Sequence, residues 1–408
     1  MKNHLTFSSR PHWCNNLVGF LLTIYITFGC LAFLIGPDVY AQVVCSVTGF
    51  TVGLCSLLVQ RTRLSWKIMV AALCIAAWMV ICSLMGSGPM RIRFLFVIAQ
   101  AGLLSCLLEK RIATFWVWIP YICFTLYYAL KLYELGDANL VSELLSRNAI
   151  SAVLLWASSL VILVREAKGQ HWNSLIALPV AVLSFVAVGR SGILASSVLM
   201  ALLIASEARQ VWNWKSGFPR KFWFGFVGAL ILTAVIAGAR LQNTETAFRF
   251  SNEGVESQVR SQIVAEYIEH LDWGGFLIGL PPSASPTMEM LDDDPHNSVI
   301  NAHMFLGVLV VPLIAIIVAA ALCAIARPTI SGAVLVALVL RSATDNIFFV
   351  NFFDFIIVYC IFTVFRNMHL GSLAVHVGPP GKPPGSTLGR KSKQRRPLDL
   401  GPDPRVDP

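Results

Sequence analysis

Long runs of apolar residues fill most of the chain between Asn16 and Phe365, and short polar segments separate them. A helix needs about 20 mostly apolar residues to cross a bilayer, and most of these runs approach that length. The pattern therefore predicts an all-α polytopic membrane protein with about 12 transmembrane helices. The expected spans are residues 17–36, 41–59, 68–86, 92–108, 112–130, 148–164, 174–188, 192–206, 222–239, 300–325, 328–340 and 347–365.

The basic residues support this count and set the orientation of the chain. Cytoplasmic loops carry an excess of Lys and Arg. With the N-terminus inside, the inner segments are basic at Lys2–Arg10, Arg61–Lys67, Lys110–Arg111, Arg165–Lys168, Arg209–Lys221 and Lys382–Arg396. The outer segments are acidic, neutral or sparsely basic, with Arg91 and Arg93 as the clearest exception. Both termini are therefore predicted to be cytoplasmic.

The apolar stretch from Ser174 to Ser206 is broken only by Gly189-Arg190-Ser191. It is too long for one ordinary span and short for two. A single tilted helix would invert everything downstream and place the basic tail outside, which contradicts the distribution of Lys and Arg. We therefore expect two short helices joined by a tight turn at the outer interface, with Gly189 supplying the backbone freedom.

One large hydrophilic loop, residues 240–299, separates spans one to nine in 1–239 from spans ten to twelve in 300–365. The middle of the loop, 253–271, has the apolar pattern of an amphipathic helix lying against the membrane. The following Gly and Pro residues break regular structure. The tail, 366–408, is rich in Pro, Gly and basic residues, which predicts a disordered cytoplasmic segment, either a partner contact or a solvated end.

The composition excludes an ordinary soluble enzyme. Hydrophobic residues make up 56% of the chain and charged residues only 13%, against roughly 25% in soluble domains. The net charge of +9 lies in the inner segments and the tail, so it is interpreted as a topology signal and not as a nucleic-acid surface. The ten cysteines lie in or beside apolar runs without metal-ligand spacing, as expected of packing residues. The first run, 17–36, exceeds a signal-peptide core and is expected to be a retained helix.

Ionisable groups near a membrane are costly, so their distribution points to a candidate site. The predicted topology places Arg190, Arg240, Arg249, Arg260, His270, His296, Arg341 and Asp345 on the outer side. Arg190 is either an ordinary interfacial arginine or a phosphate clamp, because a guanidinium offers a fork of donors that matches phosphate oxygens. Arg260 either pairs with Glu256 four residues earlier or serves the same purpose.

The end of the loop, Asp292-Asp293-Asp294-Pro295-His296-Asn297-Ser298, leads directly into the tenth span. Three consecutive acids cannot all face one cation, so a solvated turn is favoured over a metal site. His296 is either a surface imidazole or a base that titrates near neutral pH. Asn297 or Ser298 is the expected N-cap of the helix that follows.

Three features of this face occur in a recognisable order. The first is an Arg beside small residues at a tight outer turn, Gly189-Arg190-Ser191. The second is Arg260 on the loop helix, followed by an aromatic and Gly segment, Trp273–Gly279. The third is His296-Asn297 with Gly307 ten residues after the Asn. In these features, within about 175–310, the chain resembles the O-antigen ligase and Wzy-type polymerase superfamily of bacterial polysaccharide assembly.

The resemblance implies glycosyl transfer on the periplasmic face of the bacterial inner membrane, without metal or cofactor. A glycan would leave undecaprenyl pyrophosphate and join a hydroxyl of a growing polysaccharide or acceptor glycan. Arg190 and Arg260 would stabilise the pyrophosphate charge, and His296 would orient or deprotonate the acceptor hydroxyl. The expected substrate contacts are Arg240, Arg249, Asn297 and Arg341. Membrane lipid and a chain-length regulator or export complex are the other expected partners.

Polymerisation of exopolysaccharide or O-antigen repeat units is the leading hypothesis. The ligase pattern expects Gly, Thr or Tyr three residues after Gly307, and Val310 in that position disfavours transfer to lipid A-core. A transporter or lipid-linked flippase is the rival from another class, although such proteins usually have related halves and broken helices near the midplane. A structural role without catalysis is the third alternative.

Overall fold

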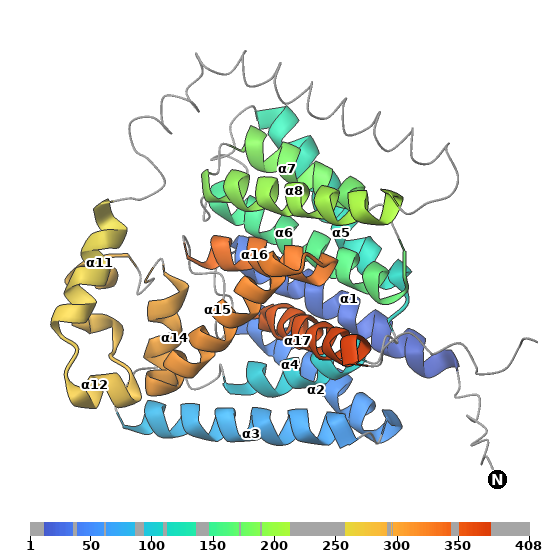
Figure 1. Ribbon diagram of the computed structural model, residues 1–408. Helices are drawn as coiled ribbons and strands as arrows, with labels where there is room; N and C mark the ends of the chain where they lie inside the picture. The colour runs from blue at the N-terminus through green and yellow to red at the C-terminus, as the bar shows by residue number, and fades with distance from the viewer. Residues whose placement is uncertain are drawn as a thin grey trace, which may run out of the picture. The chain divides into compact units, whose positions relative to one another are not determined.

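The computed structural model describes residues 12–35, 39–60, 63–85, 94–108, 112–135, 147–170, 173–187, 190–212, 258–291, 295, 297–343 and 351–376 (Figure 1). Every regular element in these ranges is a helix, and none of them contains a strand. The predicted all-α class is therefore confirmed. The chain divides into two units, Met1–Phe365 and Arg366–Pro408, and all contacts described below lie within the first.

The helices before the loop are α1 (His12–Ile35), α2 (Val39–Gln60), α3 (Arg63–Leu84), α4 (Phe94–Leu108), α5 (Thr114–Leu135), α6 (Arg147–Ala167), α7 (Ser174–Val186) and α8 (Arg190–Trp212). The loop carries α11 (Gln258–Glu269), α12 (Trp273–Ile278), the 3-10 turn η2 (Pro282–Ala284) and α13 (Pro286–Glu289). The last elements are α14 (Ser298–Leu306), the 3-10 turn η3 (Gly307–Leu309), α15 (Val310–Ala326), α16 (Ile330–Ser342) and α17 (Asp354–His376).

Helices occupy most of each predicted span except 222–239, which lies outside the described residues. Within the part of the chain that is described, five segments are long and apolar enough to cross a membrane. They are Trp66–Leu84, Thr114–Leu135, Ile150–Ala167, Ser191–Ala208 and Ser298–Ala326. Several other helices are apolar but shorter. The chain thus has the helices of a membrane protein, and the number of crossings and their orientation stay predictions.

Helix α6 forms the centre of the packed core. All its residues from Ile150 to Val164 are buried, as expected for a helix that other helices surround. The indole of Trp156 stacks on Phe353, which precedes α17, with ring centroids 4.4 Å apart. The Tyr25 hydroxyl of α1 donates a hydrogen bond of 2.6 Å to the Phe352 carbonyl. These contacts join the N-terminal helices to the last one.

Small residues let two helices of this core approach closely. A Cβ atom on Gly102 of α4 would lie 2.1 Å from the Cα atom of Gly53 in α2. Tight backbone approach at paired glycines is typical of helix packing in membranes, where dispersion contacts replace the hydrophobic driving force. The close α2–α4 approach therefore depends above all on Gly102.

The predicted division of Ser174–Ser206 into two helices is confirmed, because α7 and α8 are separate and packed together. The buried carboxylate of Glu207 accepts hydrogen bonds from the Ser174 backbone N–H at 2.9 Å and from the Ser174 hydroxyl at 2.6 Å. Glu207 lies near the end of α8 and Ser174 begins α7, so the pair forms an antiparallel hairpin. The carboxylate thus satisfies the Ser174 N–H, a donor at the positive N-terminal end of α7.

The predicted span over 300–325 is present within the apolar segment Ser298–Ala326, but it is interrupted near its start. Helix α14 ends at Leu306, Gly307 adopts a φ of +51°, and α15 begins only at Val310. A positive φ is accessible to glycine at little cost but is strained for other residues. The physical cause of the break is a contact with the loop, described below.

Candidate functional site

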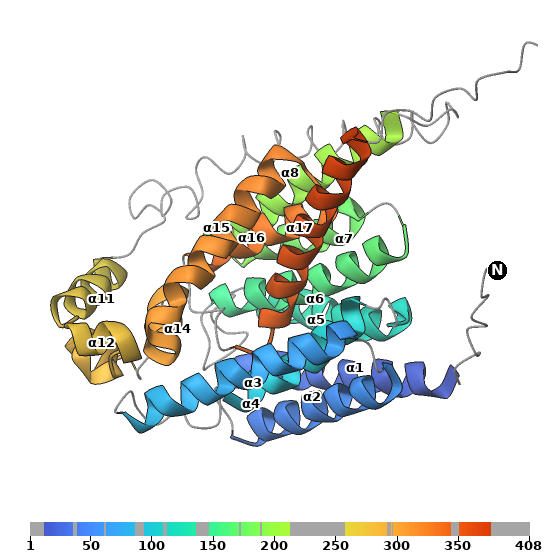
Figure 2. The same cartoon turned by 60° about the horizontal axis from the view of Figure 1, so that its bottom comes forward.

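The described part of the loop, Gln258–Leu291, forms a small packed body that we call the loop unit. Ile263 and Tyr267 of α11 are buried against Met288 of the loop unit and against Ile300 and Met304 of α14. Helices α11 and α12 accordingly lie beside α14 in both views (Figures 1 and 2). The amphipathic helix predicted over 253–271 is therefore present from Gln258 onward, and its buried face packs on α14.

Glu266 of α11 ties α11 to the segment around η2 and α13 through hydrogen bonds. One carboxylate oxygen accepts hydrogen bonds from the Ser285 hydroxyl at 2.6 Å and the Thr287 backbone N–H at 3.0 Å. The other accepts from the Thr287 hydroxyl at 2.7 Å and from Gln262 Nε2 at 2.8 Å. These bonds, led by the one from Ser285, lower the pKa of Glu266 to about 2. A carboxylate so fully bonded organises the turn at η2 and α13.

A buried histidine that the sequence analysis did not single out joins the loop unit to α14. The Nε2 atom of His303 lies 3.1 Å from the Phe276 carbonyl oxygen, and Nδ1 lies 2.8 Å from the Tyr267 hydroxyl. A carbonyl only accepts, so Nε2 carries the proton and Nδ1 accepts from Tyr267. The Tyr267 oxygen in turn accepts from the Leu280 backbone N–H at 3.2 Å. Burial raises the pKa of Tyr267 to about 12, which keeps this hydroxyl a donor.

Two glycines bring the backbones of the loop unit and the broken span into direct contact. A Cβ atom on Gly307 would lie 2.1 Å from the Leu277 carbonyl oxygen. A Cβ atom on Gly279, whose φ is +89°, would lie 2.5 Å from the His303 carbonyl oxygen. Any other residue at either position would clash with backbone. The end of α12 thus fits into the interruption between α14 and α15, which explains why the span breaks there.

Among the predicted catalytic residues, only Arg260 has a described side chain. It lies half-buried on α11, one turn before Ile263 and Val264. Arg190 is the first residue of α8, but its side chain lies outside the described residues, as does all of His296. Glu256, the alternative partner of Arg260, is also outside them. Their predicted roles stay predictions.

Asn297 is the N-cap of α14, which confirms one of the two expected caps. Its Oδ1 atom accepts hydrogen bonds from the backbone N–H groups of Val299 at 2.8 Å and Ile300 at 3.3 Å. The side-chain oxygen is therefore committed to the helix, and a substrate contact would use the Nδ2 amide. Two further predicted contacts, Arg240 and Arg249, lie outside the described residues.

Arg341 near the end of α16 is fully buried. Its Nη1 atom donates to the Ser191 hydroxyl of α8, and its Nη2 atom lies 3.5 Å from the Ser151 hydroxyl of α6. Ser191 directly follows Arg190, so the structure brings the end of α16 to the start of α8. Two arginines predicted to share one face are thus neighbours in the fold.

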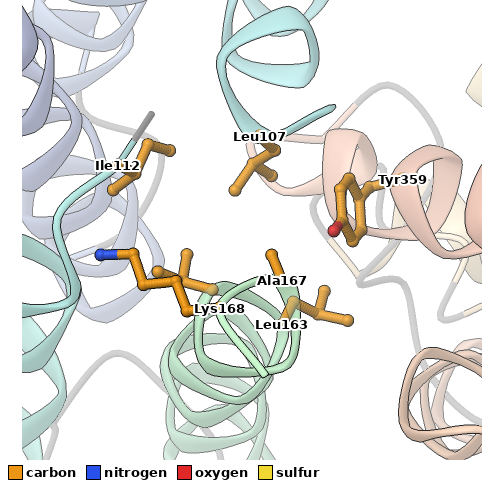
Figure 3. Close-up of a pocket in the computed structure, with 7 residues that line it drawn as sticks. Leu107, Ile112, Leu163, Ala167, Lys168 and Tyr359 are labelled. Atoms are coloured by element: carbon orange, nitrogen blue, oxygen red, sulfur yellow. The ribbon is translucent and has the colours of Figure 1, made fainter. Parts of the chain in front are cut away.

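No group of three or more His, Cys, Asp or Glu side chains suited to a metal lies within the described ranges. The triplet 292–294 lies outside them. A pocket opens where α4, α5, α6 and α17 meet, lined by Leu107, Ile112, Leu163, Val164, Ala167, Lys168 and Tyr359 (Figure 3). Its walls are almost wholly apolar, and the Lys168 ammonium at its edge donates to the Thr114 hydroxyl at 3.1 Å. None of the predicted site residues lines it.

Comparisons with known proteins give no match: no family model, no curated protein and no solved structure matches the chain.

Proposed function

We propose that this chain transfers glycans on the periplasmic face of the bacterial inner membrane. In this proposal it polymerises exopolysaccharide or O-antigen repeat units that are carried on undecaprenyl pyrophosphate. The observation that carries the proposal is the convergence of two of the resembling sequence features. The Trp273–Gly279 segment packs against Gly307, and Arg260 lies on the helix that packs on α14, which Asn297 caps. Segments that are dispersed along the chain therefore meet in one unit beside a membrane span.

The proposed chemistry needs no covalent intermediate on the protein. An acceptor hydroxyl attacks the anomeric carbon of the donor sugar, and the bond from that carbon to the pyrophosphate oxygen breaks. Negative charge develops on the pyrophosphate, which Arg260 and Arg190 would stabilise through fixed guanidinium groups. His296 would take the proton of the acceptor hydroxyl. The Nδ2 amide of Asn297, next to this base, would orient a sugar hydroxyl.

Transfer of the same donor to lipid A-core is the alternative within this class, since ligase and polymerase differ in the acceptor. A transporter is favoured by one observation, the broken span at Gly307, because interrupted helices are typical of transporter binding sites. In transporters such helix ends face a substrate cavity. Here the interruption is filled by the end of α12, and both ring nitrogens of His303 are bonded to protein atoms. This arrangement indicates that the break serves to dock the loop unit and not to bind a transported substrate.

The test is complementation of a strain that lacks the gene with Arg190→Ala, Arg260→Ala or His296→Ala. Protein level in the membrane and the glycans on the lipid carrier and cell surface would be measured. Arg327→Ala is a matched control, because Arg327 is an exposed arginine at the far end of α15. If the variants accumulate single repeat units without long polymer, the result supports polymerisation. Long carrier-linked polymer missing from lipid A-core indicates a ligase, and normal glycan from well-expressed variants contradicts catalysis.

A further inference from the structure

The depth of the loop unit in a bilayer can be inferred from α3, taken as a membrane span. The apolar segment Trp66–Leu84 has 19 residues, which is about 28 Å of helix and close to the ~30 Å core of a bilayer. Trp78 lies six residues from one end and twelve from the other, so it is about 9 Å or more inside the core whichever way α3 runs. The indole Nε1 of Trp78 donates a hydrogen bond of 2.8 Å to the Leu306 carbonyl. Leu306, the last residue of α14, therefore lies at hydrocarbon depth.

The end of α12 shares this depth. Gly307 directly follows Leu306, and a Cβ atom on it would meet the Leu277 carbonyl at 2.1 Å. Met79 of α3 packs with Phe305 and Leu306, so the contact with α3 is broader than one hydrogen bond. Helix α12 has the sequence Trp-Gly-Gly-Phe-Leu-Ile and carries no charge. A segment of this composition can remain at hydrocarbon depth.

Three backbone polar groups at or just after the end of α12 are bonded as that depth requires. Hydrocarbon offers no water, so non-helical backbone persists there only where protein groups satisfy it. The Phe276 carbonyl accepts from His303 Nε2, and the Leu280 N–H donates to the Tyr267 hydroxyl. The Gly279 N–H donates to the Gly275 carbonyl at 2.7 Å. An ionisable residue inside an apolar span is costly. The presence of His303 is explained by its hydrogen bond to the Phe276 carbonyl, which would otherwise be unsatisfied at this depth.

One face of α12 is exposed among the residues that the structure describes. Trp273 is 81% exposed and Leu277 is 48% exposed, and their spacing of four residues places both side chains on the same side of the helix. At the depth inferred from Trp78, acyl chains would cover such a face. The N-terminal end, where Asp272 caps α12 through the Gly275 N–H, carries the amphipathic Trp273 indole that is typical of the membrane interface.

We propose that α12 is a re-entrant membrane segment, which enters the leaflet on the loop's side of the bilayer and contacts lipid acyl chains through Leu277 and Trp273. The loop between residues 240 and 299 is then not wholly outside the membrane. The inference rests on the depth and bonding of α12 and does not depend on the proposed glycosyl transfer.

The test is site-specific photo-crosslinking in the full chain reconstituted in phospholipid nanodiscs. The photoreactive residue p-benzoylphenylalanine replaces Leu277 or Trp273 in separate variants, and intact-mass spectrometry detects lipid adducts after irradiation. Leu322 of α15, 61% exposed on an apolar span, is the position expected to contact lipid. Glu269, an exposed carboxylate at the end of α11, is the matched position on the loop unit expected to face water.

The proposal predicts adducts at Leu277 and Trp273 in yields comparable with Leu322, and none above background at Glu269. Each substituted side chain is exposed, so the variants should fold, and size-exclusion profiles check this. Absence of lipid adducts at Leu277 while Leu322 reacts would overturn the proposal. Equal yields at Glu269 and Leu277 would overturn it as well, because the whole loop unit would then be covered by lipid.

Discussion

Replacing Tyr267 by Phe tests the hydrogen bond between Tyr267 of the loop unit and His303 of α14. The change removes one oxygen and keeps the ring that packs in the apolar cluster with Ile263 and Met288. Two hydrogen bonds are lost, and their remaining partners are the His303 Nδ1 acceptor and the Leu280 N–H donor. A buried polar group left unsatisfied costs about 1–3 kcal/mol. With two such groups, the docked loop unit should therefore be destabilised by about 2–6 kcal/mol.

Hydrogen–deuterium exchange in nanodiscs measures this directly, because local opening controls the exchange of protected amides. A loss of 2 kcal/mol corresponds to about 30-fold faster exchange, since 1.4 kcal/mol is a factor of ten. We expect at least this acceleration in peptides that cover 267–290, with exchange in α6 unchanged. The control is Tyr133→Phe, the same substitution at a side chain of α5 that is 89% exposed.

Unchanged exchange of the 267–290 peptides in Tyr267→Phe would refute the reasoning, because the bonded hydroxyl would then contribute nothing to docking. Equal acceleration in α6 would also refute it, since the effect would be global unfolding. A double variant with His303→Leu adds a second check. The two changes should be less than additive, because each removes the same hydrogen bond.

Other predictions concern the backbone contact, the internal carboxylate and the helix cap. Gly307→Ala should lower the thermal midpoint far more than Gly169→Ala, because both glycines have a positive φ but an added Cβ meets backbone only at Gly307. The lowered pKa of Glu266 predicts that its contribution to the stability of the loop unit is complete above its ordinary pKa and is lost as pH falls from about 4.5 to about 2. Hydrogen–deuterium exchange measured against pH should show this loss in wild type and not in Glu266→Gln. The exposed control, Glu269→Gln, should behave as wild type. Asn297→Ala should cost about 1 kcal/mol in chemical unfolding, whereas Asn297→Asp should retain the cap.

The helices were predictable because a bilayer forces every spanning backbone to satisfy its own hydrogen bonds. Apolar runs alone then fix helical structure, and the distribution of Lys and Arg was sufficient to divide Ser174–Ser206 into α7 and α8. The break at Gly307 was not predictable in this way. The run over 300–325 is apolar except for Asn301 and His303, and the interruption arises from a contact with the Leu277 carbonyl, which lies outside that run.

The candidate site shows the same limit. Tyr267 is one of the positions that give the loop helix its apolar pattern, which is correct for its ring and omits its hydroxyl. The partner of that hydroxyl, His303, lies 36 residues further on, beyond any local pattern. A histidine within an apolar span was nevertheless a usable signal, because such residues are rare and need partners. For Asn297 the local pattern sufficed, since a helix cap depends only on the residues that follow it.

The most direct test of the proposed function is glycan transfer by the purified chain in nanodiscs. Carrier lipids extracted from a strain that lacks the gene would supply the lipid-linked repeat units, and mass spectrometry would follow glycan length on the carrier. The proposal predicts that wild type converts single units to longer chains, while His296→Ala and Arg260→Ala do not and Arg327→Ala does. Failure of folded wild-type protein to lengthen the glycan, or equal lengthening by His296→Ala, would contradict the proposal.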